Sequence, residues 1–520
     1  MKLAYSAADL PILKNGHHTI RSCESRTIIC FSSLSPEIIF DIFLLCACRD
    51  RHSFEIRKAP LIFTRVCRSW RAIAYSIPSL WSNMRLPSLP SKASKAISLF
   101  CALDNWLSLS KNRPLNFYLQ SSSSNSSRID RYLTILGAHS HRWRDIHFDL
   151  PSHSSFPRVS SAKFPFLERL VLNTSGTAGA EAFIVALRSV ERLQTLAIHS
   201  PWHDGFEKLL FSRSIEAFAL RCRAGYPTLN LSRLAVDMTH CHNLVSLQLC
   251  LGHLHIQELE NTPRCVLPKL ETLSLNIHDL DMLAIFIRVL KLPRLESLEL
   301  FAAPEMGLES ELIGPNLIVL LSSCTESISV LSFHAIEMPP GDLRNVLAVA
   351  KNIQSLTLTS MASTYDILNH LAFRFSPTGQ LIWGQNTNLS DLTVIPDWEP
   401  DSRPSWDEDE DDENSNVEFY RQYCKQLVDV VESRRTIPGD AHCSDGEDIA
   451  ELRTIGIDLD FWRTAEQLGA IEHSRLEGWQ DTMNLMPYEK YPDRTHDIFN
   501  HLSKINPRFD LEFDILSSLL

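Results

Sequence analysis

A chain of 520 residues with 44% hydrophobic side chains is too long for one compact core, so we expect several structural units. Its 62 acidic residues outnumber 50 basic ones, and the net charge of -12 argues against nucleic acid as a partner, because binding to phosphate backbones needs clustered positive charge. The thirteen cysteines, such as Cys46, Cys67, Cys101 and Cys250, lie mostly in apolar segments and are predicted to be reduced core residues. The sequence shows no secretory signal or long uncharged apolar run, so we expect a cytoplasmic or nuclear protein without a membrane partner.

The first helix is predicted to begin at Pro36, after an extension over 1–30 that we expect to be disordered. Ser35 can cap this helix, Pro36 suits its first position, and Glu37 places negative charge at the positive end of the helix dipole. The residues that follow predict one broad apolar face, made of Ile38, Ile39, Ile42, Phe43 and Cys46.

A second helical pattern begins at Pro60 and ends before Pro78, which is followed by the apolar pair Leu80 and Trp81. A unit of about fifty residues encloses little surface, so it cannot hide all the large side chains that these segments carry. We therefore expect some of them to contact another protein. The alternative is a self-contained helical cap whose tryptophans fill its own core.

The segments LSPEIIFDIF, VCRSW and IPSLW resemble the F-box, in the variant common in fungal F-box proteins. The sequence departs from that pattern by Ser35 and by a long connector between the two halves. The resemblance implies that residues 31–86 dock on the Skp-type adaptor of an SCF ubiquitin ligase, and through it on a cullin. With the apolar face of the first helix, it assigns adaptor contacts to Leu34, Pro36, Glu37, Ile38, Ile39, Ile42, Phe43, Val66, Cys67, Trp70, Leu80 and Trp81.

A linker helix is expected over 87–112, and a repeated pattern follows it. Strict copies of Leu-x-x-Leu-x-Leu, with Ile at the last position of the second copy and at the first position of the sixth, begin at Leu167, Leu193, Leu244, Leu270, Leu295 and Ile353. Looser copies begin at Trp143, Ile215, Leu231, Ile328, Leu389 and Leu452. Copies 25 or 26 residues apart, such as those at Leu167 and Leu193, fall within the range of about 20 to 29 residues for leucine-rich repeats.

Helical runs such as 281–290 lie between the copies, so each unit is predicted to be a strand followed by a helix. The predicted fold class is α/β, with the helical F-box followed by a leucine-rich-repeat solenoid over 113–396, a curved parallel sheet with outer helices. The repeats resemble the irregular leucine-rich repeats of F-box proteins. The short intervals on either side of Leu231 leave open whether that copy is a strand.

Alternation along each strand points the leucines into the core and the residues between them to the inner, concave face. A concave surface of about ten strands at roughly 4.8 Å each suits the binding of a protein substrate. An ordinary solvated sheet face is the alternative for any single residue. The candidate substrate contacts are Arg169, Thr195, Gln248, Thr272, Ser274, Glu299 and Thr357.

Seven consecutive carboxylates over 407–413 repel one another, so we expect the acidic insert 397–447 to be largely disordered. The segment 448–520 is predicted to hold the last repeat and a C-terminal cap.

Motifs of catalysis are missing: there is no Gly-x-Gly-x-x-Gly, phosphate loop or Gly-x-Ser-x-Gly. The histidines in HCH (240–242) and HLH (253–255) are too close together for a zinc site. We expect no catalytic residue, cofactor or metal. The leading hypothesis is a non-catalytic substrate-recognition subunit of an SCF-type ubiquitin ligase, and the alternative is a leucine-rich-repeat interaction scaffold without a ligase role.

Overall fold

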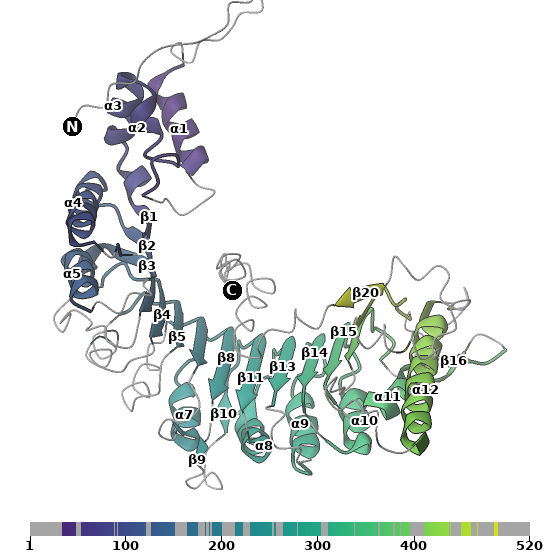
Figure 1. Ribbon diagram of the computed structural model, residues 1–520. Helices are drawn as coiled ribbons and strands as arrows, with labels where there is room; N and C mark the ends of the chain where they lie inside the picture. The colour runs from purple at the N-terminus through teal and green to yellow at the C-terminus, as the bar shows by residue number, and fades with distance from the viewer. Residues whose placement is uncertain are drawn as a thin grey trace, which may run out of the picture.

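A single large sheet dominates the computed structural model. Fourteen strands pair in the order β1-β2-β3-β4-β5-β6-β8-β11-β13-β14-β15-β18-β19-β20, and neighbouring strands are parallel. The sheet is curved: the helices lie on its convex side, and its other face lines the inside of the curve (Figure 1). The predicted α/β class with a curved parallel sheet and outer helices is thus confirmed. The structure describes residues 34–47, 54–87, 89–90, 92–120, 126–150, 164–174, 183, 187, 190–199, 214–221, 229–251, 254–255, 264–277, 279–302, 310–336, 338–361, 364–377, 380–384, 386–395, 410–435, 437, 449–458, 465 and 483–486.

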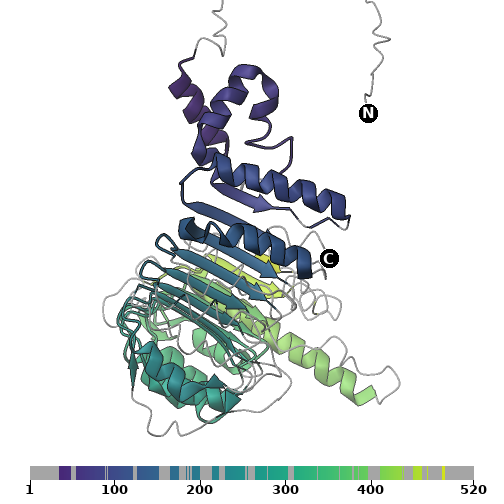
Figure 2. The ribbon, with the colours of Figure 1, turned by 90° about the vertical axis from the view of Figure 1, so that its left-hand side faces the viewer.

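The N-terminal helices stand at one end of the sheet (Figure 2). Helix α1 (Pro36–Ala47) begins where predicted, and the Ile38 N–H donates to Ser35 Oγ at 3.4 Å. The second predicted helix is two helices, α2 (Phe63–Val66) and α3 (Arg68–Ser76). Cys67 separates them because its backbone is extended, and its Sγ accepts from the Trp70 N–H at 3.4 Å as a cap for α3. The 3-10 helix η2 (Pro78–Trp81) follows.

Aromatic side chains form the interior of this helical unit. Phe43 of α1 stacks on Phe63 of α2 with ring centroids 4.2 Å apart, and Trp70 lies 5.0 Å from Phe43. The Trp81 indole donates to the Ala74 carbonyl at 2.9 Å and packs edge-on against Trp106, which belongs to the next helix, at 5.0 Å. The unit is therefore joined to the repeats by its own core.

The sheet begins inside the segment predicted to be the F-box. Strand β1 (Asn83–Leu86) pairs with β2 (Leu115–Gln120), and the Asn116 N–H donates to the Ser82 carbonyl at 2.8 Å. Helix α4 (Ala93–Leu109) then crosses from β1 to β2. The helix predicted over 87–112 is therefore present as α4, but it is the helix of the first strand-helix unit and not a linker, so the prediction that the repeats start at 113 is wrong. A strand of four residues gave too short an alternation to be recognised.

Strands β4, β5, β8, β11, β13 and β15 carry the strict copies of the repeat, and β3, β6, β14, β18 and β19 carry looser ones. The strands of the large sheet beyond β2 are β3 (Trp143–Leu150), β4 (Arg169–Thr174), β5 (Thr195–His199), β6 (Ala217–Arg221), β8 (Ser246–Leu251), β11 (Thr272–Ile277), β13 (Ser297–Phe301), β14 (Val330–His334), β15 (Ser355–Thr359), β18 (Asp391–Ile395), β19 (Thr454–Asp458) and β20 (Met483–Met486).

The looser copy at Leu231 is not a strand. It forms helix α7 (Leu231–Met238), in which Leu234, Ala235 and Met238 are buried at helical spacing. The remaining helices are α5 (Ser126–Gly137), η3 (Ser140–Arg142), α8 (Leu280–Val289), α9 (Ile313–Leu321), α10 (Pro340–Val349) and α11 (Thr364–Leu371). Short pairs of strands complete the fold: β7 (Leu229–Asn230) with β9 (Leu254–His255), β10 (Cys265–Val266) with β12 (Leu290–Lys291), and β16 (Arg374–Phe375) with β17 (Leu381–Trp383).

The core lies between the sheet and the outer helices. One column of paired residues runs along the sheet and is buried throughout, which explains why the repeat keeps its leucines. Val171, Ala197 and Ala219 form a separate apolar cluster because they alternate with the core leucines and point to the opposite face. The buried column is Leu170, Leu196, Phe218, Leu247, Leu273, Leu298, Leu331, Leu356, Leu392 and Ile455.

Helix α12 (Glu410–Arg435) covers the far end of the repeats and packs on α11. The prediction of a largely disordered insert over 397–447 is therefore wrong for 410–435. The buried residues of α12 recur at helical spacing: Tyr420, Tyr423, Cys424, Leu427, Val430 and Val431. The predictions for 1–30 and for the part of 448–520 after β20 concern residues outside those that the structure describes.

The cysteines divide between core and surface. Cys250 is buried as predicted, whereas Cys46, Cys67 and Cys101 are exposed, so the prediction that these three are core residues is wrong. In the described part of the chain, no helix is both long and apolar enough to span a membrane.

Candidate functional site

The first candidate surface lies on the N-terminal helices, where large apolar side chains are uncovered. Leu45 is 70% exposed, Val66 is 55% exposed and Ile38 is 49% exposed. Half of the exposed large hydrophobic side chains of the described chain fall within residues 38–75. We call this set the N-terminal apolar surface: Ile38, Phe40, Leu45, Ile56, Ile62, Val66 and Tyr75.

Helix α1 is apolar on two sides. Its inner side, with Ile39 and Phe43, is buried in the unit, while Ile38, Ile42 and Leu45 recur at helical spacing on the other side and are exposed or partly exposed. A helix that is apolar all round is usually buried on all sides. The outer side of α1 therefore has the composition of a contact surface.

The predicted adaptor contacts divide into two groups. Ile39, Phe43, Leu80 and Trp81 are buried in the chain itself, so the prediction that they contact a partner directly is corrected to a supporting role beneath the surface. The others are exposed or partly exposed: Leu34, Pro36, Glu37, Ile38, Ile42, Val66, Cys67 and Trp70.

Charged groups accompany these apolar side chains. Hydrogen bonds with its own backbone N–H and with Ser35 lower the pKa of the exposed Glu37 carboxyl. Arg65, Arg68 and Arg71, on α2 and α3, are exposed. The basic side chains suit a partner with acidic groups at the edge of its contact surface.

The second candidate surface is the concave face of the sheet. The residues at the middle of its strands form one continuous row, which we call the concave column: Val171, Ala197, Ala219, Gln248, Ser274, Glu299, Ser332 and Thr357. Four of the predicted substrate contacts lie in this row. Gln248, Ser274 and Glu299 are buried, so they are not open to direct contact in the structure, whereas Thr357 is partly exposed. Arg169, Thr195 and Thr272 lie in the row beside it.

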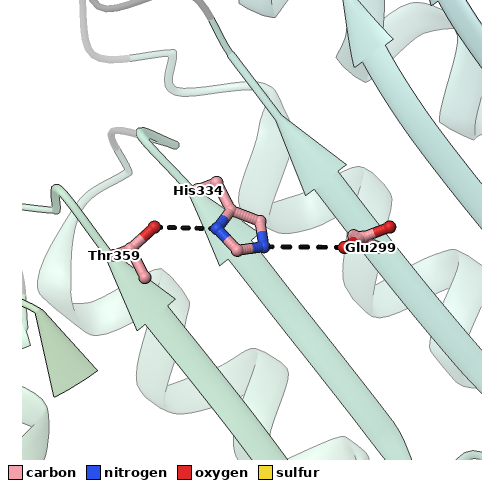
Figure 3. A network of polar contacts seen from close by, with 3 residues as sticks. All are labelled: Glu299, His334 and Thr359. Carbon is pink, nitrogen blue, oxygen red and sulfur yellow. Dashed lines mark hydrogen bonds and ion pairs between the residues drawn. The ribbon is translucent and has the colours of Figure 1, made fainter. Parts of the chain in front are cut away.

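Glu299 on β13 is the central ionisable group of the concave column (Figure 3). Its side chain is largely buried, and this desolvation raises the pKa of its carboxyl to about 7, while the nearby Ser274 hydroxyl acts in the opposite direction. His334 Nε2 lies 3.8 Å from Glu299 Oε1, and His334 Nδ1 lies 2.8 Å from Thr359 Oγ1. The imidazole also stacks on Phe301 with ring centroids 4.1 Å apart.

Sequence reasoning missed Phe301, His334 and Thr359. Each follows directly after the third apolar position of its copy, so extending the alternation by one residue would have placed it on the concave face. These residues form a third row beside the concave column.

Gln248 on β8 is a buried amide without a protein partner. The residue is only 2% exposed, and within the described part of the chain neither Oε1 nor Nε2 has a hydrogen-bond partner. An unsatisfied buried amide destabilises the fold by about 1–3 kcal/mol, and a ligand that supplies both an N–H and a C=O removes this penalty.

Groupings suited to chemistry are few. Among the described residues, no three His, Cys, Asp or Glu side chains are arranged to hold a metal ion. A depression of about 400 Å³ at the edge where the strands begin is open and carries mixed charge. It is lined by Glu168, Glu191, Arg192, Gln194, Ser214, Glu216 and Asn243.

The comparisons with known families and with curated proteins find no match. No model of a known protein family matches the sequence, and no curated protein is found to be significantly similar to it. Function is therefore inferred from the N-terminal apolar surface and the concave face.

Proposed function

We propose that this chain is a substrate-recognition subunit of an SCF-type ubiquitin ligase. In this proposal the N-terminal unit is an F-box that binds the Skp-type adaptor, the repeats are leucine-rich repeats that bind a protein substrate, and catalysis belongs to the partners. The observation that carries the proposal is the N-terminal apolar surface, because all its members lie within residues 31–86, the part of the chain that resembles the F-box.

Energetics support a protein partner for this surface. Covering a large apolar side chain contributes roughly 1.5–3 kcal/mol, so several together can stabilise a specific complex. Leu45 and Val66 are more than half exposed, whereas Phe43 and Phe63 of the same helices are buried. The buried aromatic residues hold the helices in place while the outer ones stay free for contact.

The test is capture of a purified Skp-type adaptor by the full-length chain. We expect Leu45→Asp and Val66→Asp to weaken capture at least tenfold, because each places a charge in an apolar contact. Val319→Asp on α9 is the matched control, since Val319 is also 55% exposed but lies outside the N-terminal unit. Surface variants are preferable to changes at Trp70, which packs against Phe43 and Phe63.

The competing function is an interaction scaffold in which the N-terminal helices only cap the rod. The packing of Trp81 against Trp106 favours that reading, because it joins the helices to the first repeat. If the adaptor does not bind the unaltered chain, or if Val66→Asp and Val319→Asp bind equally well, the ligase proposal is refuted and the scaffold remains.

A further inference from the structure

We propose that the outer face of α8 and α9 binds the same face of a second copy of this chain, with the helices of the two copies antiparallel. This face lies on the convex side of the sheet, away from the N-terminal helices (Figure 1). The inference goes beyond the proposed function and does not depend on it. We call these side chains the outer helix face: Asp281, Ile285, Arg288, Leu312, Pro315 and Val319.

The α9 part of this face is apolar where contact with water would favour polar side chains. None of the nine residues of α9 is charged. Leu312, which directly precedes the helix, is 49% exposed, and Val319 is 55% exposed. They are seven positions apart, about two helical turns, so they lie on one side with the exposed Pro315 between them. A surface helix usually carries polar residues on its outer side, so this composition indicates a contact with another molecule.

Helix α8 extends this apolar surface into the preceding repeat. The hydroxyl of Ser310, just before α9, donates to Asp281 Oδ1 at 2.8 Å, so the two helices begin side by side. Both lead from one parallel strand to the next and therefore run in the same direction. Ile285 is partly exposed one turn after Asp281. The outer helix face is thus one surface across two repeats.

The charges on α8 favour a second copy as the partner. Its only charged residues are Asp281 in the first turn and Arg288 in the last turn, and both are exposed. Seven positions separate them, so they lie on the same side of the helix. Neither forms an ion pair within the described part of the chain. An antiparallel second copy places each Asp281 opposite the other copy's Arg288, which makes two equivalent ion pairs.

The same two-fold rotation brings Leu312 of each copy near Val319 of the other. Apolar contacts would then occupy the α9 side of the interface and ion pairs the α8 side. A partner with a single sign of charge would be attracted by one end of α8 and repelled by the other. The outer helix face is therefore complementary to itself.

The size of this face limits the strength of the dimer. Helix α8 has ten residues and α9 has nine, so each is roughly 15 Å long. Two such helices about 10 Å apart cover less than the roughly 800 Å² that each partner buries in a standard interface. We therefore expect weak association, with a Kd of roughly 10 to 100 µM.

Sedimentation equilibrium of the full-length chain from about 1 to about 200 µM tests the inference. The unaltered chain should show a monomer–dimer equilibrium. Val319→Asp should raise the Kd at least tenfold, because it places a charge in the apolar part of the interface. Ile97→Asp on α4 is the matched control, since Ile97 is 54% exposed outside the outer helix face, and it should leave the Kd unchanged.

A charge exchange tests the antiparallel arrangement. Asp281→Arg and Arg288→Asp should each raise the Kd roughly tenfold, because each variant alone sets like charges opposite one another. Mixing the two variants should restore the Kd of the unaltered chain, because every facing pair is then of opposite charge. Recovery on mixing cannot come from a damaged fold, so this readout stands even if one variant is less stable.

The inference is overturned if the chain stays monomeric over this range, if Val319→Asp and Ile97→Asp dimerise equally well, or if mixing the charge variants restores nothing. It is also overturned if Leu45→Asp separates the copies and Val319→Asp does not, since the N-terminal apolar surface would then be the site of self-association. Adaptor capture is measured on the same preparations. A monomeric chain that captures the adaptor refutes the dimer alone, and a dimer that does not capture it refutes the ligase alone.

Discussion

Replacing Glu299 by glutamine should change how the stability of the protein depends on pH. The carboxyl has an ordinary pKa of 4.5 and a pKa of about 7 in the folded chain, because burial disfavours its charged form. The folded state therefore keeps a proton that the unfolded state releases between these two values. The stability that this proton contributes is fully present below pH 4.5 and is lost as the pH rises through 7.

The magnitude follows from the same two pKa values. At about 1.36 kcal/mol per pKa unit, the difference between 4.5 and about 7 corresponds to about 3 kcal/mol. Glutamine has nearly the shape of the protonated acid and does not ionise. The variant should thus gain about 3 kcal/mol relative to the unaltered protein between pH 4.5 and pH 8.

Hydrogen exchange of the backbone amides in β13 is the suitable assay, because long repeat arrays do not unfold in one step and local opening is measured strand by strand. Protection would be compared at pH 5, 6, 7 and 8 for the unaltered protein, Glu299→Gln and the exposed control Glu296→Gln. His334→Gln tests the contribution of the neighbouring imidazole. Parallel pH profiles for the unaltered protein and Glu299→Gln would refute the reasoning, since they would mean that the carboxyl ionises in the folded state as readily as in water.

Three further outcomes are expected. Trp81→Ala should lower the local stability of α3 by about 3–5 kcal/mol, measured by hydrogen exchange, because the indole is buried and bonded to Ala74. Ile97→Ala on the exposed side of α4 should change little, and equal losses would contradict this reasoning. Arg434→Met should speed proteolysis of α12, because the buried Arg434 guanidinium donates to the Leu371 and Asn386 carbonyls. Lys425→Met, at an exposed position of the same helix, should leave the rate unchanged. Equal rates for the two variants would show that these hydrogen bonds do not hold the helix in place. Iodoacetamide should label the exposed Cys46, Cys67 and Cys101 before the buried thiols, whose pKa is raised to about 12 by burial. The buried thiols are those of Cys241, Cys265, Cys324 and Cys424. The order of labelling is read by mass spectrometry, and the reverse order would refute the expectation.

The repeats could be predicted from sequence because their signal is redundant. Each strict copy places two apolar residues on one face of a strand, and many copies at a similar spacing support one another. The copy at Leu231 failed because Leu231 and Leu234 suit a helical spacing as well as the repeat pattern. Only packing against neighbouring repeats decides between the two.

Other parts of the molecule required three-dimensional information. The acidic run at the start of α12 masked the helical pattern that follows it, and the four residues of β1 gave too little alternation to predict a strand. Which apolar residues of the N-terminal unit are exposed depends on how its helices pack, so Ile39 and Ile38 could not be told apart from spacing alone. The approach of His334 to Glu299 joins adjacent strands 35 positions apart in the chain, and sequence spacing does not reveal it.

The junction at Ser82 joins the N-terminal unit to the repeats without a flexible joint. The 3-10 helix ends at Trp81 and the first strand starts at Asn83, while the Ser82 carbonyl is already held by Asn116. A molecule bound to the repeats and one bound to the N-terminal helices would thus be held at a fixed distance and in a fixed orientation relative to each other. Inserting a glycine-serine spacer after Ser82 would leave both contact surfaces intact but would no longer fix their relative orientation.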